Sequence, residues 1–289
     1  MRLSIRDSPE QVGLYVGDYL AKRINEFEPS AEKPHFVLGL PTGSSPLPTY
    51  HRLVELVQKG DLSFKDEYVG LPRDHPESYH TFMYTNFFSK IDIVPDNTHI
   101  LDGEAEDLLH ECVEYERKIK SVGGIDIFLG GMGEDGHLAF NEDPANPPSV
   151  DPSQPGSSLV SRTRIKTLAY DTILANARFF NNDLSAVPRM ALTVGIATVM
   201  DAREVILVVT GQKKAMALSQ CIENGINHFW TASALQSHPW SLLVCDEDAT
   251  LELRVKTVRY FKSIEKVQDE VEAKYGGAAV RKTRVNGVH

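Results

Sequence analysis

Short apolar runs of strand length alternate with segments of helical periodicity along most of this sequence. The expected strands cover 35–40, 125–131, 204–211 and 241–245, and the expected helices cover 46–59, 75–90, 111–120, 187–200, 212–223 and 250–264. Strands that alternate with helices build a mainly parallel sheet, because each helix returns the chain across one face of the sheet. The pattern therefore predicts an α/β fold with helices on both faces, and no internal repeat is visible.

Length and charge limit the domain organisation and the partners. A chain of 289 residues can bury about three quarters of the surface that it exposes when unfolded, which is enough for one large core. We expect a single α/β domain over residues 1–275 and a flexible tail over 276–289, where basic residues lack apolar periodicity. The net charge of −10 argues against a nucleic-acid partner, since phosphate backbones need clustered lysine and arginine. A small phosphorylated ligand remains compatible with this charge.

The cysteines and the N-terminal segment indicate the compartment. Cys112, Cys221 and Cys245 are far apart and odd in number, so neither a disulfide framework nor a zinc site is expected. Their apolar neighbours favour buried thiols. The segment MRLSIRDSPE lacks the apolar core of a signal peptide, and no apolar run is long enough to cross a membrane. We therefore expect a cytoplasmic protein with no membrane partner.

The segment LGLPTGSSP, at 38–46, joins an expected strand to an expected helix. Its glycine lets the backbone approach a ligand, and backbone amides at a helix N-terminus point toward an anion. Nearby hydroxyl groups add donors, so the loop is a candidate phosphate site formed by Thr42, Gly43, Ser44 and Ser45. The segment matches neither GxGxxG nor the P-loop, so nucleotide binding is not implied. A turn with a capping serine is the alternative.

Phosphate capture normally adds a cation, and candidates occur in two segments. Lys213 and Lys214 lie at another strand-to-helix junction, and Arg178 lies among apolar residues, which suggests a partly buried guanidinium. Ligands of parallel sheets collect at the carboxyl ends of the strands, so the two junctions can converge. A solvated position on a helix is the alternative for either lysine.

The segment GGMGEDGHLAFNE, at 130–142, follows an expected strand and carries a histidine between carboxylates. Its glycines hold Asp135 and His137 on one short loop, where a carboxylate can orient an imidazole. Glu142 can approach the same imidazole if the chain turns back. This arrangement suits general acid–base chemistry on a sugar hydroxyl or ring oxygen. The alternative is a structural turn that satisfies His137, and the spacing argues against a metal site.

Two further segments bear on this site. Asp66 and Glu67 precede Tyr68 in KDEYVGLPRDHPESY, which composition alone favours as a charged surface turn. The segment 143–155 is rich in proline, which excludes a helix or a central strand. We therefore expect a solvated loop directly after Glu142.

Several of these segments together resemble glucosamine-6-phosphate deaminases over about residues 1–265. The segments that carry the resemblance are LGLPTGSSP, DEYVGLPRDHPESY, GGMGEDGHLAFNE, GSSLVSRTRIKTLAYDT, ANARFF, ALTVG and CDEDATLELRVKTVRYF. The SRTRIKT run separates this family from 6-phosphogluconolactonases, which look similar in fold and share a Gly-rich Asp-Gly-His loop. The resemblance implies a Rossmann-like fold, a hexamer, and conversion of glucosamine 6-phosphate and water into fructose 6-phosphate and ammonia. It implies neither a metal ion nor an organic cofactor.

The resemblance also implies roles for individual residues. His137, supported by Asp135 and Glu142, would open the pyranose ring, and Asp66 would move a proton from C2 to C1 through an enolamine. The implied substrate-binding residues are Thr42, Gly43, Ser44, Ser45, Arg178 and Lys214. Some members of the family are activated by N-acetylglucosamine 6-phosphate at a subunit interface. The matching allosteric positions are Ser157, Ser158, Arg164, Lys166, Thr167 and Tyr260.

The sequence departs from this family in two places. The family has a short apolar strand before Asp-Glu-Tyr, whereas here DLSFK runs directly into DEYVG, so one strand is missing before Asp66. Either DLSF takes the place of that strand, or Asp66 is displaced from the site. The proline-rich insertion at 143–155 lies between Glu142 and the implied effector residues, so it can alter regulation.

Two other functions are compatible with these features. One is a non-catalytic phosphosugar-binding protein, whose C2 base is lost together with the missing strand. The other is a 6-phosphogluconolactonase-like hydrolase, which needs neither Asp66 nor the SRTRIKT run. Release of ammonia from glucosamine 6-phosphate would separate a deaminase from both.

Overall fold

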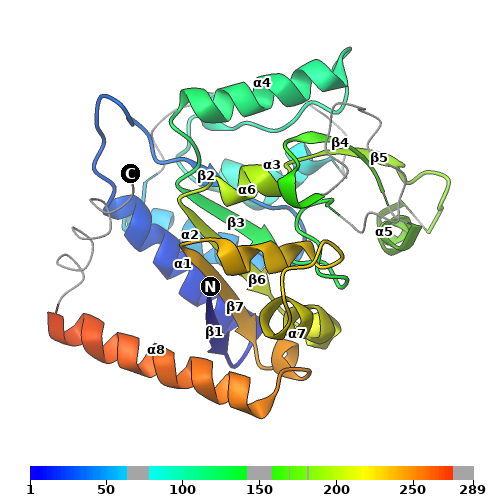
Figure 1. Cartoon of the computed structure of the whole chain (residues 1–289). Coiled ribbons are helices and arrows are strands. Elements are labelled where there is room, and N and C mark those ends of the chain that lie inside the picture. The colour runs from blue at the N-terminus through cyan, green and yellow to red at the C-terminus, as the bar shows by residue number, and fades with distance from the viewer. Residues whose placement is uncertain (64–77, 142–157, 169, 181, 276–289) are drawn as a thin grey trace.

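The fold centres on a five-stranded parallel sheet (Figure 1). The computed structural model describes residues 1–63, 78–141, 158–168, 170–180 and 182–275. Within them the strand order is β1–β7–β6–β3–β2, and every neighbouring pair is parallel. The strands are β1 Arg2–Arg6, β2 Leu38–Gly39, β3 Ile127–Gly131, β6 Glu204–Val209 and β7 Ser241–Asp246. The mainly parallel α/β sheet predicted from the alternation is confirmed.

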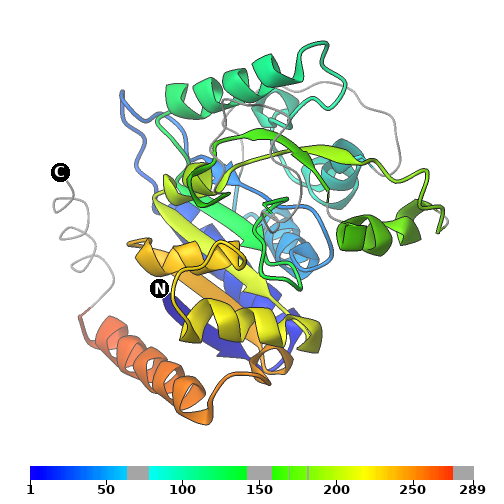
Figure 2. The same cartoon turned by 45° about the vertical axis from the view of Figure 1, so that its right-hand side comes forward.

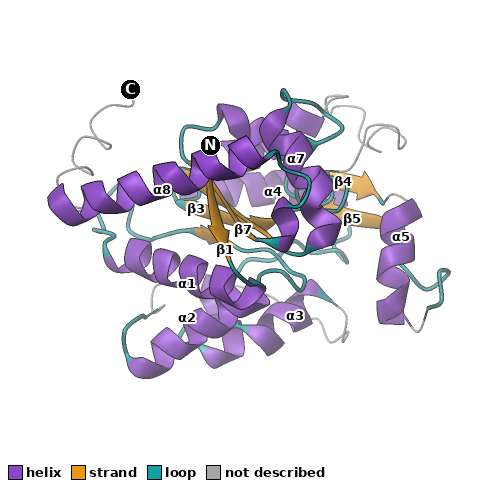
Figure 3. Cartoon of the chain, turned by 90° about the horizontal axis from the view of Figure 1, so that it is seen from below, coloured by secondary structure: helices purple, strands orange, loops and turns teal. Residues whose placement is uncertain are grey.

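Helices cover both faces of this sheet (Figure 3). One face carries α1 Pro9–Asn25, α2 Leu47–Lys59 and α3 Tyr79–Asn86, whose buried side chains pack with Ile127 and Leu129 of β3. The other face carries α6 Ile196–Met200 and α7 Ala215–Glu223, which pack with Phe128. Successive side chains of one strand point to opposite faces, so a strand buried on both faces reads as a continuous apolar run.

Most of the expected helices begin and end close to their sequence signals. Asp107 caps α4 Leu108–Ser121 by accepting the N–H of His110 at 2.9 Å, and the left-handed Gly60 ends α2. The helix expected over 75–90 begins only at Tyr79, where Ser78 accepts the N–H of Thr81 at 3.0 Å. Its continuation is the 3-10 turn η1 Phe88–Lys90.

The first half of the helix expected over 187–200 is wrong. β4 Arg164–Thr167 and β5 Met190–Thr193 form a separate antiparallel pair, and α6 begins only at Ile196. Gly195 separates β5 from α6, where a Cβ would overlap the carbonyl group of Ser161. Apolar periodicity does not distinguish a buried helix from a strand whose partner lies far away in the sequence.

The edge strands differ most from expectation. β2 comprises two residues instead of the whole run 35–40, and it lies at the edge opposite β1 among the described strands. β1 and α1 had no counterpart in the expected pattern, yet β1 pairs in parallel with β7. The last helix, α8 Val255–Tyr275, begins later than the expected 250.

Several expectations fall outside the described residues. They concern Asp66, the loop 143–155 and the tail 276–289. Residues 61–63 of the DLSF segment form no strand, and Phe64 is outside the described range. No helix in the described part of the chain is long and apolar enough to cross a membrane.

The prediction of buried cysteines is confirmed. All three thiols are buried. Burial raises the pKa of Cys221 and of Cys245 to about 12, so both thiols stay protonated at neutral pH. They are packing groups of the core and not nucleophiles.

Candidate active site

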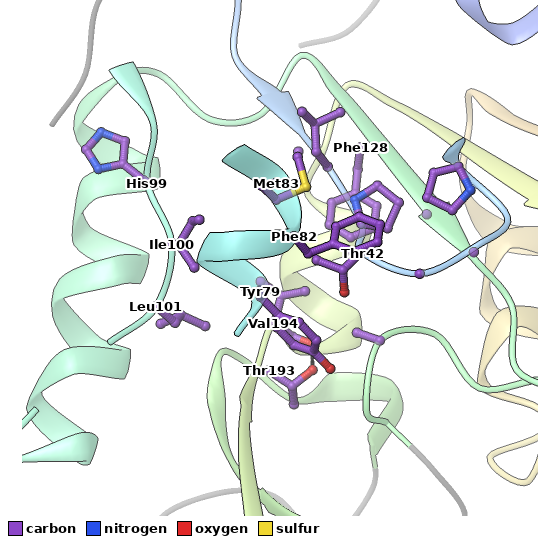
Figure 4. A pocket seen from close by; sticks show the side chains of 18 of the residues that line it. Thr42, Tyr79, Phe82, Met83, His99, Ile100, Leu101, Phe128, Thr193 and Val194 are labelled. Atoms are coloured by element: carbon purple, nitrogen blue, oxygen red, sulfur yellow. Dashed lines mark hydrogen bonds between the residues drawn. The ribbon is translucent and has the colours of Figure 1, made fainter. Parts of the chain in front are cut away.

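The carboxyl ends of β2, β3 and β6 open into a large cavity. These strands are neighbours in the sheet, so the loops that follow them meet at one edge. The cavity has a volume of about 2270 Å³, and Figure 4 shows part of its wall, to which Thr42 and the α3 residues Phe82 and Met83 contribute. The candidate residues that line it are Thr42, Gly43, Ser44, Ser45, Asp135, His137, Lys213 and Lys214. The loop, the imidazole and the cations therefore face a common space.

Within the described residues, the loop between β2 and α2 leaves the N-terminus of α2 without a side-chain cap. In the described structure no side chain caps α2, whose N-cap residue is Pro46, and its first turn contains no acidic residue. The positive end of the helix is therefore not neutralised from within the loop. Gly43 has a φ of 105°, a left-handed value that favours glycine. The alternative of a serine-capped turn is wrong.

The second junction follows β6 and is held by an acid that sequence reasoning missed. Gly211 donates its N–H to both carboxylate oxygens of Asp246, at 3.0 and 2.9 Å, and Asp246 is buried at the end of β7. This contact fixes the turn before the 3-10 turn η5 Gln212–Lys214, whose Lys213 and Lys214 reach the cavity. The sequence feature that could have indicated this residue is its position directly after the apolar run SLLVC, at the carboxyl end of an expected strand.

Asp135 and His137 are in direct contact on the loop after β3, here called the His137 loop (residues 133–141). Nδ1 of His137 lies 2.5 Å from Oδ1 of Asp135. Gly133 makes this approach feasible, because a Cβ there would lie within 2.5 Å of Asp135 Oδ1 and would overlap the imidazole. Gly133 also donates its N–H to the carbonyl of His137 at 2.9 Å, which closes the turn.

The charge state of Asp135 follows from this contact. Burial by itself raises the pKa of Asp135, but the hydrogen bond and charge of His137, together with backbone amides of the loop, outweigh it and lower the pKa below its ordinary value. The carboxylate is thus ionised at neutral pH and can hold the imidazole in one orientation.

A distant segment supports the His137 loop. Ala232 donates its N–H to the carbonyl of Gly136 at 3.0 Å, and Thr231 accepts the N–H of Leu138 at 3.1 Å. The indole of Trp230 fills the space beside Gly136, where a Cβ would lie 2.6 Å from Cε3. Sequence reasoning missed these residues, because the supporting segment lies about 90 residues further along the chain.

Most of the chain is closely similar to curated deaminases. Residues 7–150 match the family described as glucosamine-6-phosphate isomerases/6-phosphogluconolactonase. Glucosamine-6-phosphate deaminase 1 from Homo sapiens is 58% identical over 278 residues, which cover 94% of this chain and 92% of the relative. Glucosamine-6-phosphate deaminase from Aedes aegypti is 56% identical, with coverage of 98% and 99%. The chain belongs to the glucosamine-6-phosphate deaminase family.

Solved structures agree with this family assignment. A monomeric glucosamine-6-phosphate deaminase is 36% identical, with a TM-score of 0.75, and the match covers 87% of this chain and 100% of that one. The 6-phosphogluconolactonase of Trypanosoma cruzi is 20% identical, with a TM-score of 0.62 over 87% of this chain and 96% of that one. That second likeness shows the fold alone, so the deaminase family remains the specific match.

Three positions that the deaminase resemblance marks, Asp66, Glu142 and Ser157, lie outside the described residues. Arg178 lies in the 3-10 turn η4 Ala177–Phe180, and its side chain is likewise outside the described structure. Their roles stay predictions.

The implied effector residues of this deaminase family member fall into two groups. Ser158, Arg164 and Lys166 are buried at the β4 side, where Arg164 donates to Oγ of Ser158 at 2.8 Å. Thr167 ends β4 beside them. Tyr260 is exposed on α8, at the opposite end of the molecule (Figure 1 and Figure 2). One chain therefore does not bring Tyr260 to the β4 group.

The described ranges of the chain contain no group of three or more histidine, cysteine, aspartate or glutamate side chains placed to hold a metal ion. The polar groups of the cavity include a hydroxyl-rich loop, a carboxylate–imidazole pair and lysines.

Proposed function

We infer that this protein converts glucosamine 6-phosphate and water into fructose 6-phosphate and ammonia. The observation that carries the inference is the common cavity, where an anion-binding loop and the His137–Asp135 pair face one space. The relatives named glucosamine-6-phosphate deaminase at 58% identity support the same reaction. The lactonases share only the fold at 20% identity or below, so they do not favour the hydrolase alternative.

The phosphate group would bind at the N-terminus of α2. Backbone amides and the hydroxyls of Thr42, Ser44 and Ser45 offer donors, and Lys214, with Arg178 by resemblance, would add positive charge. Binding of the phosphate at this point would hold the sugar ring at a fixed distance from the imidazole. The ring would therefore be oriented for reaction.

Ring opening requires proton transfer at the ring oxygen, and the proposal gives this step to His137. Asp135, whose carboxylate lies 2.5 Å from Nδ1, would orient the imidazole, and Nε2 would exchange the proton with substrate. Glu142, which directly follows the His137 loop in the sequence, would assist by the resemblance. Asp66 would then take the C2 proton and return it at C1, since a positioned carboxylate can act as a base next to a carbonyl or iminium carbon. These assignments to Glu142 and Asp66 rest on the resemblance.

Regulation by N-acetylglucosamine 6-phosphate is part of the proposal. Arg164 and Lys166 supply buried positive charge, and Ser158 and Thr167 are polar groups on the same side of the fold. Ser157 would join them by the resemblance. Because Tyr260 is remote within one chain, it would reach this site from a neighbouring copy, which requires a homo-oligomer. We propose a hexamer acting in the cytoplasm, without a metal ion or organic cofactor.

An assay of ammonia release from glucosamine 6-phosphate tests the proposed function. The wild-type protein should release ammonia and fructose 6-phosphate in equal amounts, and His137→Gln should slow turnover because glutamine cannot transfer the proton. Asp66→Asn should abolish turnover while binding of the phosphosugar persists. Tight binding without turnover by the wild-type protein would instead support the non-catalytic alternative. Hydrolysis of 6-phosphogluconolactone without ammonia release would support the lactonase.

A further inference from the structure

Asn141 is a fully buried side chain whose amide is completely paired. Its Nδ2 donates to the carbonyl of Leu138 at 3.0 Å and to that of Val194 at 2.8 Å. Its Oδ1 accepts from Arg164 at 2.9 Å and from Ser161 at 3.4 Å. An asparagine amide has two donors and two acceptor positions, so no hydrogen-bonding capacity is left over. Such a residue fixes the relative position of every group that it contacts.

On one side, Asn141 holds the end of the His137 loop. Leu138 directly follows His137, and Ala139 has a φ of 52°, an unfavourable left-handed value for a residue with a Cβ. Backbone strain of this kind persists only where the surroundings hold the turn, and the Asn141 side chain spans it by bonding to Leu138. The placement of His137 therefore depends on Asn141.

On the other side, Asn141 contacts a buried guanidinium that lacks a charged partner in the described structure. Arg164 is 3% exposed, and within the described residues its guanidinium donates hydrogen bonds to the neutral oxygens of Asn141 and Ser158. Its Nε is buried with no hydrogen-bond partner. Burial lowers the pKa of Arg164, which means that the charged form is poorly solvated there. An incoming anion would gain from binding this group.

These two sides meet in one amide. We propose that Asn141 is a positioning residue that ties the His137 loop to Arg164, so that a sugar phosphate bound at Arg164 alters ring opening through Asn141. The proposal rests on the proposed function and extends it to the connection between the two sites. An anion on Arg164 draws the guanidinium away from Oδ1 of Asn141, and the same amide then adjusts its hold on Leu138.

The substitution Asn141→Asp tests the connection with almost no change in shape. Aspartate keeps an acceptor for Arg164, but both donors to Leu138 and Val194 are lost. We expect kcat for ammonia release to fall about tenfold to a hundredfold with KM within about twofold, because misplaced catalytic groups reduce turnover more than binding. Activation by N-acetylglucosamine 6-phosphate should disappear. The matched control Asn224→Asp makes the same change at an exposed asparagine and should leave kcat and activation intact.

The variant Thr231→Val distinguishes a specific connection between Arg164 and the His137 loop from general stabilisation of that loop. Thr231 accepts the N–H of Leu138 and donates to the carbonyl of Asn141, and neither of these hydrogen bonds involves Arg164. Its loss should lower kcat while the activation factor stays at the wild-type value. Equal loss of activation in Thr231→Val and Asn141→Asp would overturn the proposal.

A fluorescence measurement that does not require turnover tests the connection separately from the proposed function. Trp230 packs beside Gly136, so its fluorescence in a Trp240→Phe background reports on the His137 loop. Adding N-acetylglucosamine 6-phosphate should shift this emission in the wild-type background and not in Asn141→Asp. An absent shift in the wild-type background overturns the link, even if ammonia is released. If Asn141→Asp does not fold, the neutral variant Asn141→Ser replaces it, and wild-type kcat and activation in that variant would overturn the proposal.

Discussion

At the residue scale, the candidate catalytic pair depends on a position that has no side chain. Gly133 lies so close to His137 and Asp135 that its missing Cβ is a condition of their contact. The loop therefore uses glycine for space at Gly133, whereas at Gly136 it uses glycine both for space beside Trp230 and for a φ of 74°. A histidine-to-carboxylate motif in a sequence shows the reacting groups, but the neighbouring glycines decide whether those groups can meet.

Gly133→Ala should reduce kcat by about tenfold to a hundredfold, because the new methyl group displaces the imidazole from Asp135. The phosphate loop is untouched, so KM should change little. Gly225→Ala is the control, since a Cβ at Gly225 meets open space. Steady-state kinetics of ammonia release on both variants checks the prediction, and wild-type kcat in Gly133→Ala would contradict the geometry.

The lowered pKa of Asp135 predicts how its contribution to stability varies with pH. A carboxyl group whose pKa is lower in the folded state stabilises the fold at pH values above its unfolded pKa of about 3.9. That contribution is lost as the pH falls through the lower folded pKa. Urea unfolding from about pH 6 down to about pH 3 should show that the wild-type advantage over Asp135→Asn is constant at first and then shrinks. An advantage that grows toward low pH would contradict the sign of the shift.

At the element scale, α2 connects stability with binding, because its buried face packs on the sheet while its N-terminus faces the cavity. Leu53 is fully buried in this contact, and Leu14 of α1 is 46% exposed. Truncating each leucine to alanine therefore compares the stability contributed by a buried side chain with that contributed by an exposed one.

Leu53→Ala should lower the free energy of unfolding by about 2–5 kcal/mol, the usual cost of a cavity in a packed core. Leu14→Ala should change it by less than about 0.5 kcal/mol. Urea denaturation monitored by circular dichroism measures both values. A small effect at Leu53 would mean that α2 is not anchored as the structure places it.

Elements that depend on local signals were predictable, and those that depend on distant partners were not. The Gly60 cap and the apolar run of β6 are local features, and both α2 and β6 agree with expectation. The segment 187–193 has the apolar content of a helix, but it pairs with β4 more than twenty residues earlier and becomes β5. The sequence motif pointed to Asp135 and His137. Thr231, which supports the His137 loop, and Asp246, which holds the turn at Gly211, act through tertiary contacts instead. Such contacts have no periodicity or motif by which to find them.

At the scale of the whole molecule, the implied effector residues are divided between two ends of the fold. Arg164 is buried at the β4 pair, whereas Tyr260 is 57% exposed on α8 (Figure 1). A site that uses both residues must therefore join two copies of the chain. In a closed ring, each copy would give its Arg164 to one neighbour and its Tyr260 to another, so every subunit contributes to two sites.

This geometry predicts complementation between variants. Arg164→Ala and Tyr260→Ala should each abolish activation by N-acetylglucosamine 6-phosphate when expressed alone, because every site then lacks one contact. Co-expression of the two variants should restore part of the activation, since some interfaces combine an intact Arg164 with an intact Tyr260. The measurement is ammonia release with and without the effector, on purified mixed assemblies carrying two affinity tags. If the mixed assemblies show no more activation than either variant alone, Arg164 and Tyr260 do not share a site across an interface, and Tyr260 is only an exposed ring on α8.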